Sequence, residues 1–128
     1  MGTQSAGRPI RLSALAQSDI TAILRWSEEE FGVSARERYA ALIGAALRDL
    51  QADPQGTGSQ ARSELGSGVL SYHLHFSRRH VLAASGIVRR PRHLLLYRIE
   101  PDGVVAVARL LHDSMELARH LPKADPSA

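Results

Sequence analysis

The amino-acid sequence predicts an α+β fold in which an N-terminal helical hairpin packs on one face of a small, mostly antiparallel sheet, followed by a short C-terminal helix. Residues 15–50 carry apolar side chains at helical spacing on both sides of a single-glycine joint. Residues 69–77 alternate between apolar and polar side chains, and two apolar runs flank a turn sequence at residues 100–103. With 128 residues, 44% of them hydrophobic, the chain can bury one core and is expected to form one domain.

The helical hairpin is expected to follow a short edge strand at residues 9–13, whose leading proline is tolerated at a strand start. The first helix is predicted over residues 15–31 and ends at Gly32. The sequence SARE, with Ser34 as N-cap, has the spacing of a capping box and predicts the start of the second helix. That helix is expected to end at Asp53, because the residue before a proline disfavours helical backbone.

Three more strands are predicted after a Gly- and Ser-rich loop at residues 54–68. They are residues 69–77, 93–99 and 104–111. Residues 78–92 lack a regular pattern and are expected to form a long, arginine-rich loop. Residues 113–121 read as a short closing helix, with Asp113 or Ser114 as its cap.

The turn between the last two strands predicts which side chains share a face of the sheet. If residues 101–103 form the loop, Glu100 pairs with Val104 and the register follows. The bulkier set is expected to lie under the helices: Leu95, Tyr97, Ile99, Val105, Val107 and Arg109. The other set is expected to form a shallower face that could accept a partner: Leu94, Leu96, Arg98, Ala106, Ala108 and Leu110.

Charge is distributed unevenly along the chain, although the formal net charge is only +3. Residues 65–99 contain no acidic residue and carry six arginines: Arg78, Arg79, Arg89, Arg90, Arg92 and Arg98. Arginine suits planar recognition with several donors better than a general lysine coat does. The basic middle therefore predicts an acidic partner, either a protein surface or a nucleic acid.

Composition also excludes several classes of function. The chain has no cysteine, which excludes disulfides and thiolate metal sites. His73 and His75 share a strand face without an evident third ligand, so neither a metal nor a cofactor is expected. Residues 1–8 have no apolar segment of a secretory signal, and no run is long enough to span a membrane. We expect disordered tails at residues 1–8 and 123–128, a single domain at 9–122, and a cytoplasmic location.

Several segments carry a family resemblance. They are RLSALAQSDITAILRWSEEEFG at the start, ARERYAALIGAALRDLQADP in the second helix and LLLYRIEPDGVVAVARLLHDSMELARHL at the end. The last contains Tyr97-Arg98, Arg109-Leu110-Leu111-His112, Met115 and His120-Leu121 in a characteristic order. Together these stretches resemble ParE toxins, members of the RelE/ParE superfamily from bacterial type II toxin–antitoxin systems. The resemblance extends over about residues 10–121, and the long crossing at residues 77–92 departs from it.

This resemblance implies a toxin that inhibits DNA gyrase. It also implies a ParD-like antitoxin that neutralises the toxin, and a complex of the two that binds operator DNA through the antitoxin. RelE relatives on the same fold instead cut mRNA in the ribosome, so the fold alone leaves this alternative open. A second alternative is a non-catalytic nucleic-acid-binding domain that uses the arginines of residues 65–99.

Each hypothesis assigns its own residues. Inhibition of gyrase needs no catalytic group, and its target contacts would be Arg78, Arg79, Arg89, Arg90 and Arg92. The antitoxin would cover Leu94, Leu96, Arg98, Ala106, Ala108 and Leu110. A nuclease would use Arg98, Arg109 and His112 to bind and polarise the phosphate. The simpler expectation is that Arg109 pairs with a carboxylate or carbonyls at the core rim and that His112 makes a hydrogen bond where the last strand ends. Trp26 is expected to pack in the core, whereas an exposed Trp26 would be a plausible interface anchor.

Overall fold

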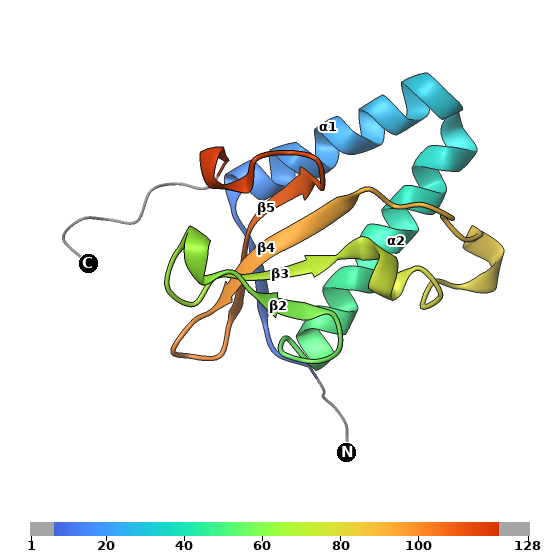
Figure 1. The fold of residues 1–128 in the computed structure, drawn as a ribbon. Helices are drawn as coiled ribbons and strands as arrows, with labels where there is room; N and C mark the ends of the chain where they lie inside the picture. The colour runs from blue at the N-terminus through green and yellow to red at the C-terminus, as the bar shows by residue number, and fades with distance from the viewer. Residues whose placement is uncertain (1–6, 121–128) are drawn as a thin grey trace, which may run out of the picture.

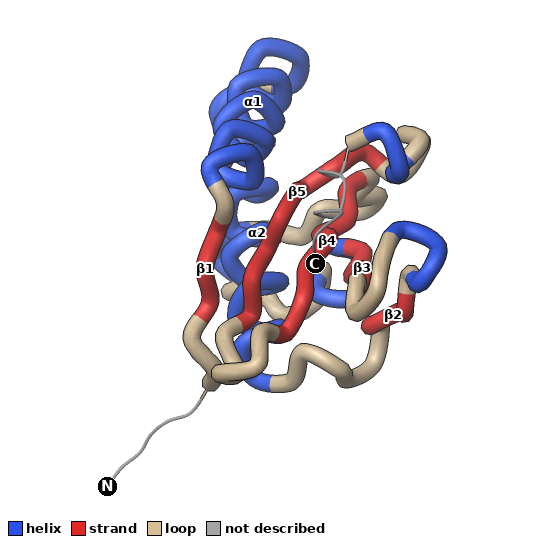
Figure 2. Tube along the Cα trace, turned by 90° about the vertical axis from the view of Figure 1, so that its left-hand side faces the viewer, coloured by secondary structure: helices blue, strands red, loops and turns tan. Residues whose placement is uncertain are grey.

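Two helices cover one face of a five-stranded sheet (Figures 1 and 2). The computed structural model describes residues 7–120, so most of the two expected tails and Leu121 lie outside the described part. The helices are α1 (Ala14–Phe31) and α2 (Val33–Ala52), and the strands are β1 (Ile10–Leu12), β2 (Ser59–Ala61), β3 (Leu70–His73), β4 (His93–Ile99) and β5 (Val105–His112). The sheet order is β1-β5-β4-β3-β2, with only β1 and β5 parallel.

The predicted α+β fold is therefore confirmed, with one change at its end. The expected C-terminal helix is reduced to a 3₁₀ turn at Leu117–Arg119. The other 3₁₀ turns are Ser63–Leu65, Leu74–Ser77 and Ala83–Ser85. Within residues 7–120 no helix is long and apolar enough to cross a membrane.

The helical hairpin starts at Ser13 and bends at Gly32. The Ser13 hydroxyl accepts a hydrogen bond from the Ala16 N–H (3.0 Å) and donates to the Ala108 carbonyl (2.7 Å), which ties the helix start to β5. Gly32, at φ 95°, is the only residue between the helices. The expected cap at Ser34 is wrong, because this one-residue joint already lets α2 begin at Val33.

Strand β3 is shorter than the alternating pattern of residues 69–77 predicts. It ends at His73, whose Nδ1 accepts a hydrogen bond from the His75 N–H (3.1 Å) and so turns the chain into a 3₁₀ turn. Ser77, expected on the polar face, is buried and donates to the Asp49 carboxylate of α2. The edge strand β2 is a three-residue segment inside the expected loop that pairs with β3.

The β4–β5 hairpin has the predicted register near its turn but not beyond it. Ile99 pairs with Val105 and Tyr97 with Val107, after which a β-bulge makes Leu96 the partner of Arg109. The extra residue reverses the faces of β5 beyond the bulge. Leu110 was expected on the open face, but it lies in the main core at 1% exposure, whereas Arg109 lies at its rim.

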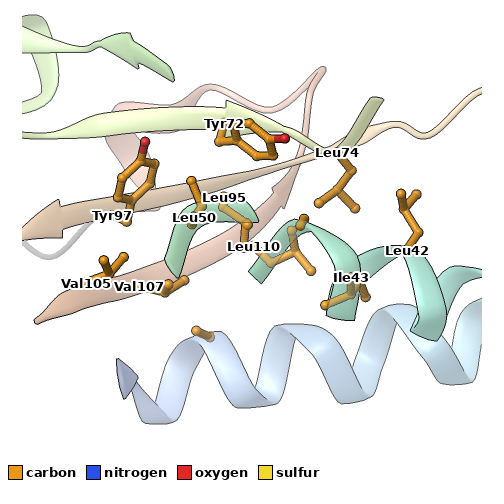
Figure 3. Packing of buried hydrophobic residues seen from close by; sticks show 12 residues of the cluster. Leu42, Ile43, Leu50, Tyr72, Leu74, Leu95, Tyr97, Val105, Val107 and Leu110 are labelled. Carbon is orange, nitrogen blue, oxygen red and sulfur yellow. The ribbon is translucent and has the colours of Figure 1, made fainter. Parts of the chain in front are cut away.

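The main core lies between the sheet and the two helices (Figure 3). It contains Leu42, Ile43 and Leu50 of α2, and it closes on the strand residues Tyr72, Leu95, Tyr97, Val105, Val107 and Leu110. The Tyr97 hydroxyl is satisfied by the Pro54 carbonyl at 2.5 Å. These contacts confirm that the helices pack on the side of the sheet that carries the bulkier residues.

The opposite face of the sheet is not the open surface that the sequence predicts. Leu94, Leu96 and Leu111 form a second apolar cluster, against which Leu65 and Leu117 pack from two 3₁₀ turns. Leu94 and Leu96 are consequently only 6% and 0% exposed. Leu65 and Leu117 thus shield from water an apolar surface that would otherwise be exposed on this face of the sheet.

Candidate functional site

Arg109 is tied to helix α1 by a two-pronged ion pair. Its Nε lies 2.8 Å from Asp19 Oδ2 and its Nη2 lies 2.9 Å from Asp19 Oδ1, while Nη1 donates to the His120 carbonyl. Both side chains are only 15% exposed. The hydrogen bonds that Arg109 donates to Asp19 raise the pKa of Arg109 above its usual value. The expected rim pairing of Arg109 with a carboxylate and a carbonyl is confirmed.

Asp19 also takes the place of a missing strand neighbour. Strand β1 pairs with β5 only along Val105–Val107, so the backbone beyond it has no strand partner on that side. Asp19 Oδ2 accepts the Leu110 N–H at 3.0 Å. The carboxylate thus satisfies a backbone donor that would be costly to bury without a partner.

His112 lies where strand β5 ends. Its Nδ1 accepts hydrogen bonds from the Ser114 N–H (3.1 Å) and hydroxyl (2.7 Å), which turns the chain out of the sheet as expected. Because Nδ1 is the acceptor, the proton of the neutral ring is on Nε2.

The three residues assigned to a nuclease do not converge. Arg98 pairs with Ala106 near the hairpin turn and donates to the Ser67 carbonyl, whereas His112 pairs with His93 at the other end of the sheet. Ala106 and His112 are six positions apart along β5, which corresponds to at most about 20 Å at the usual rise per residue. Arg109 is occupied by Asp19. Arg98 and His112 therefore lie at opposite ends of the β4–β5 hairpin, and Arg109, between them, is engaged by Asp19.

The end of the sheet that contains His112 holds a polar cluster that sequence reasoning missed. The Tyr39 hydroxyl of α2 lies 2.6 Å from His93 Nδ1 and accepts the Arg92 N–H at 3.2 Å. The rings of His93 and His112 meet edge to face, 5.3 Å apart. Only long-range packing joins these residues, since they come from a helix and two strand ends.

Burial controls protonation in this cluster. It raises the pKa of Tyr39 to about 12, so the hydroxyl, which is hydrogen-bonded to His93 Nδ1, keeps its proton at neutral pH. Burial, reinforced by the nearby His112, lowers the pKa of His93 from 6.5 to about 4. The Tyr39 hydroxyl and the His93 ring are thus both uncharged near pH 7.

Asp113 joins the cluster to the arginine-rich segment at residues 78–92. Its carboxylate accepts two-pronged hydrogen bonds from Arg92, at 2.8 Å from Nη2 to Oδ1, and another from His73 Nε2 at 2.9 Å. The Arg92 hydrogen bonds hold the pKa of Asp113 well below its usual range. Asp113, expected as a helix cap, instead fixes the position of Arg92.

Acid is expected to destabilise the protein through His93. Between pH 6.5 and about 4 the unfolded chain takes up a proton that folded His93 excludes, so the free energy of unfolding falls as the pH falls through this range. Asp113 acts in the same direction at lower pH, because its pKa is depressed in the folded state. Urea unfolding at pH 7.5, 6 and 5 measures the effect. The His93→Asn variant should show a shallower fall, and an equal slope in both proteins would contradict this assignment.

The arginine-rich segment is anchored rather than loose. Asp49 accepts hydrogen bonds from Ser77 and from His80 Nδ1 at 2.7 Å, and Val81 and Val88 pack against the main core. Gly86, at φ 81°, passes so close to Arg38 that a Cβ there would lie 2.9 Å from the Arg38 Cδ. These contacts fix the segment beside α2 (Figure 1).

The five predicted target arginines fall into two groups. Arg92 pairs with Asp113, and Arg78 donates to the Arg89 carbonyl at 3.0 Å, so both contribute to the shape of the segment. Arg79, Arg89 and Arg90 are exposed, and no carboxylate of residues 7–120 pairs with them. The second group is the available positive surface.

A cleft of about 750 Å³ lies between the helical hairpin, the arginine-rich segment and the histidine end of the sheet. The helices contribute Ile23, Trp26, Phe31, Arg38 and Tyr39 to its walls. The segment contributes Ile87, Val88, Arg89, Arg90 and Arg92, and the sheet contributes His93 and His112. No acidic side chain lines it among the described residues. Nor do three His, Cys, Asp or Glu side chains within residues 7–120 gather as metal ligands would.

Comparison with known proteins agrees with this fold. The family model "ParE toxin of type II toxin-antitoxin system, parDE" matches residues 10–117. A solved toxin–antitoxin complex, RelBE2 from Mycobacterium tuberculosis, has the same fold, with a TM-score of 0.51 and 23% identity, over 84% of this chain and 99% of that one. A search of curated protein sequences finds no significant match. The fold is that of a RelE/ParE-type toxin.

More narrowly, this chain belongs to the ParE toxin family of type II toxin–antitoxin systems.

Proposed function

We propose that this toxin inhibits DNA gyrase by binding to it and cuts no nucleic acid itself. The single observation that supports this function best is the engagement of the Arg109 guanidinium by Asp19, which leaves Arg109 unavailable to bind a phosphate. A ribonuclease needs charge stabilisation at the phosphate and proton-transfer groups at one place. Arg109 instead pairs with Asp19 at the rim of the core, and His112 turns the chain at the end of β5.

In this proposal Arg79, Arg89 and Arg90 form the target surface. Gyrase presents acidic protein surface and bound DNA, both of which attract an exposed arginine cluster. Arg78 and Arg92 hold the segment in shape through their own contacts. A ParD-like antitoxin neutralises the toxin, and the complex binds operator DNA through the antitoxin. In this proposal the toxin therefore acts in the cytoplasm.

Purified gyrase and relaxed plasmid test the proposal. Supercoiling should stop as toxin is added, and the same toxin should leave mRNA intact in a translation extract. Undiminished supercoiling at a large excess of folded toxin would contradict the proposed function.

One observation favours the RelE-type alternative. His112 lines the same cleft as Arg89, Arg90 and Arg92, which places one proton-transfer group near several phosphate-binding groups. In that case mRNA cleavage should appear in the extract and should depend on His112.

A further inference from the structure

The two halves of the arginine-rich segment are joined by a hydrogen bond. Arg78 Nη1, at the start of the segment, donates to the Arg89 carbonyl near its end at 3.0 Å. This contact brings the backbone that carries Arg79 next to the backbone that carries Arg89 and Arg90. The segment lies at the outer edge of the domain beside α2, where a large partner can reach it (Figure 1).

The carboxylates that contact this segment hold it in place and leave part of its charge uncompensated. Asp49 accepts a hydrogen bond from His80, and Asp113 accepts the hydrogen bonds of Arg92. Within residues 7–120, no carboxylate forms an ion pair with three exposed arginines of the segment: Arg79, Arg89 and Arg90. These three guanidinium groups are therefore available to a partner of negative charge.

The backbone of the segment already has a fixed shape before any partner binds. Val81 and Val88, one in each half, pack against the main core. Together with the contacts of Asp49 and Asp113, they set the path of the chain on both sides of the exposed arginines. Binding a partner then orders little more than the arginine side chains, which lowers the entropic cost of binding.

A surface of uninterrupted positive charge fits a polyanion better than it fits a protein. The centres of protein–protein interfaces are depleted of charged residues, whereas residues 65–99 of this chain carry six arginines and no acid. Duplex DNA carries one negative charge per about 1.7 Å of helix axis. A planar guanidinium group can donate to two phosphate oxygens at once. The chemistry of these arginines therefore matches the phosphate backbone of DNA.

We infer that Arg79, Arg89 and Arg90 bind the phosphate backbone of the duplex DNA that gyrase holds. The inference rests on the proposed function, because it takes this DNA to be part of the target. These contacts do not depend on base sequence, since phosphate contacts carry no direct sequence information. The toxin alone should therefore bind duplex DNA weakly and without sequence preference, and contacts with gyrase make the binding tighter.

The test measures binding of the full-length toxin to a fluorescent duplex of about 20 base pairs, without gyrase, between about 50 and 200 mM KCl. Binding that neutralises phosphates weakens as salt rises, with a slope of log K against log salt of about −0.9 per phosphate. Replacing Arg79, Arg89 and Arg90 together with glutamine should make this slope less negative by about 2.7, which is roughly 40-fold in affinity over this range of salt.

The matched control removes the same number of charges outside the segment. It replaces the exposed residues Arg11, Arg25 and Arg48 with glutamine. Its slope should differ from that of the wild type by less than about 0.9, the value of one phosphate contact. Circular dichroism and melting temperature establish that each variant is folded.

Equal slopes for the two glutamine variants, or no binding of DNA by about 0.1 mM wild-type toxin in about 50 mM KCl, would overturn the inference. If such a toxin still stops supercoiling, and does so only with its three arginines, these side chains contact acidic protein surface of gyrase instead. Failure of the proposed function gives a different result, in which the arginines bind DNA as expected while gyrase stays active. The two claims can therefore fail separately.

Discussion

Asp19→Ala is expected to lower the free energy of unfolding by about 3 kcal/mol, a large share of the 5–15 kcal/mol typical of such a domain. The substitution leaves the Arg109 guanidinium, at 15% side-chain exposure, without its carboxylate, and it leaves the Leu110 N–H without an acceptor. Both effects act at the same end of β5. Urea unfolding followed by circular dichroism gives the value.

Asp19→Asn is the matched control, since its amide oxygen can still accept the Leu110 N–H while the charge is lost. The free energy of unfolding of Asp19→Asn should lie between that of the wild type and that of Asp19→Ala. A loss below about 1 kcal/mol for Asp19→Ala would mean that the pair behaves like an ordinary surface ion pair. Such a result would remove the structural role assigned to Arg109.

Reversing the charge of Arg79, Arg89 and Arg90 together to glutamate is expected to abolish inhibition of gyrase. The triple variant changes the local charge by six units while leaving the Arg92–Asp113 pair and the Arg78 contact with Arg89 O in place. Single reversals should be weak, because each exposed pair contributes roughly under 1 kcal/mol. Supercoiling at increasing toxin concentration measures the effect.

A control variant carries the same change of charge elsewhere. It reverses the exposed residues Arg11, Arg25 and Arg48, which lie outside the arginine-rich segment. This control should inhibit gyrase almost as the wild type does. If both triple variants lose inhibition equally, net charge rather than this surface is responsible.

Local signals were sufficient to predict the helical hairpin and the final β-hairpin. Gly32 separates two helical patterns, and the turn at residues 100–103 fixes the nearby register. The β-bulge between Leu96 and Tyr97 could not be predicted from the sequence. The run VVAVARLL is apolar at nearly every position, so its pattern does not show whether Arg109 or Leu110 faces the helices. Contacts with Ser13 and Asp19, distant in sequence, accompany the observed register.

The candidate site also depends on contacts between residues that are distant in sequence, which local patterns do not predict. The alternation of residues 69–77 favours one long strand, but Ser77 reaches Asp49, 28 residues earlier, and the chain turns at His73 instead. The cleft combines parts of two helices, the arginine-rich segment and two strand ends. Composition did identify the arginines and Trp26, but only the fold shows which arginines are paired and that the tryptophan is exposed.

The most direct test of the central claim compares wild-type toxin with His112→Ala in two assays, supercoiling by purified gyrase and mRNA integrity in a translating extract. If the toxin acts by binding, both folded proteins stop supercoiling at similar concentrations and neither shortens the mRNA. If wild-type toxin cleaves mRNA and His112→Ala does not, while supercoiling is unaffected by either, the toxin is a nuclease and the account is contradicted.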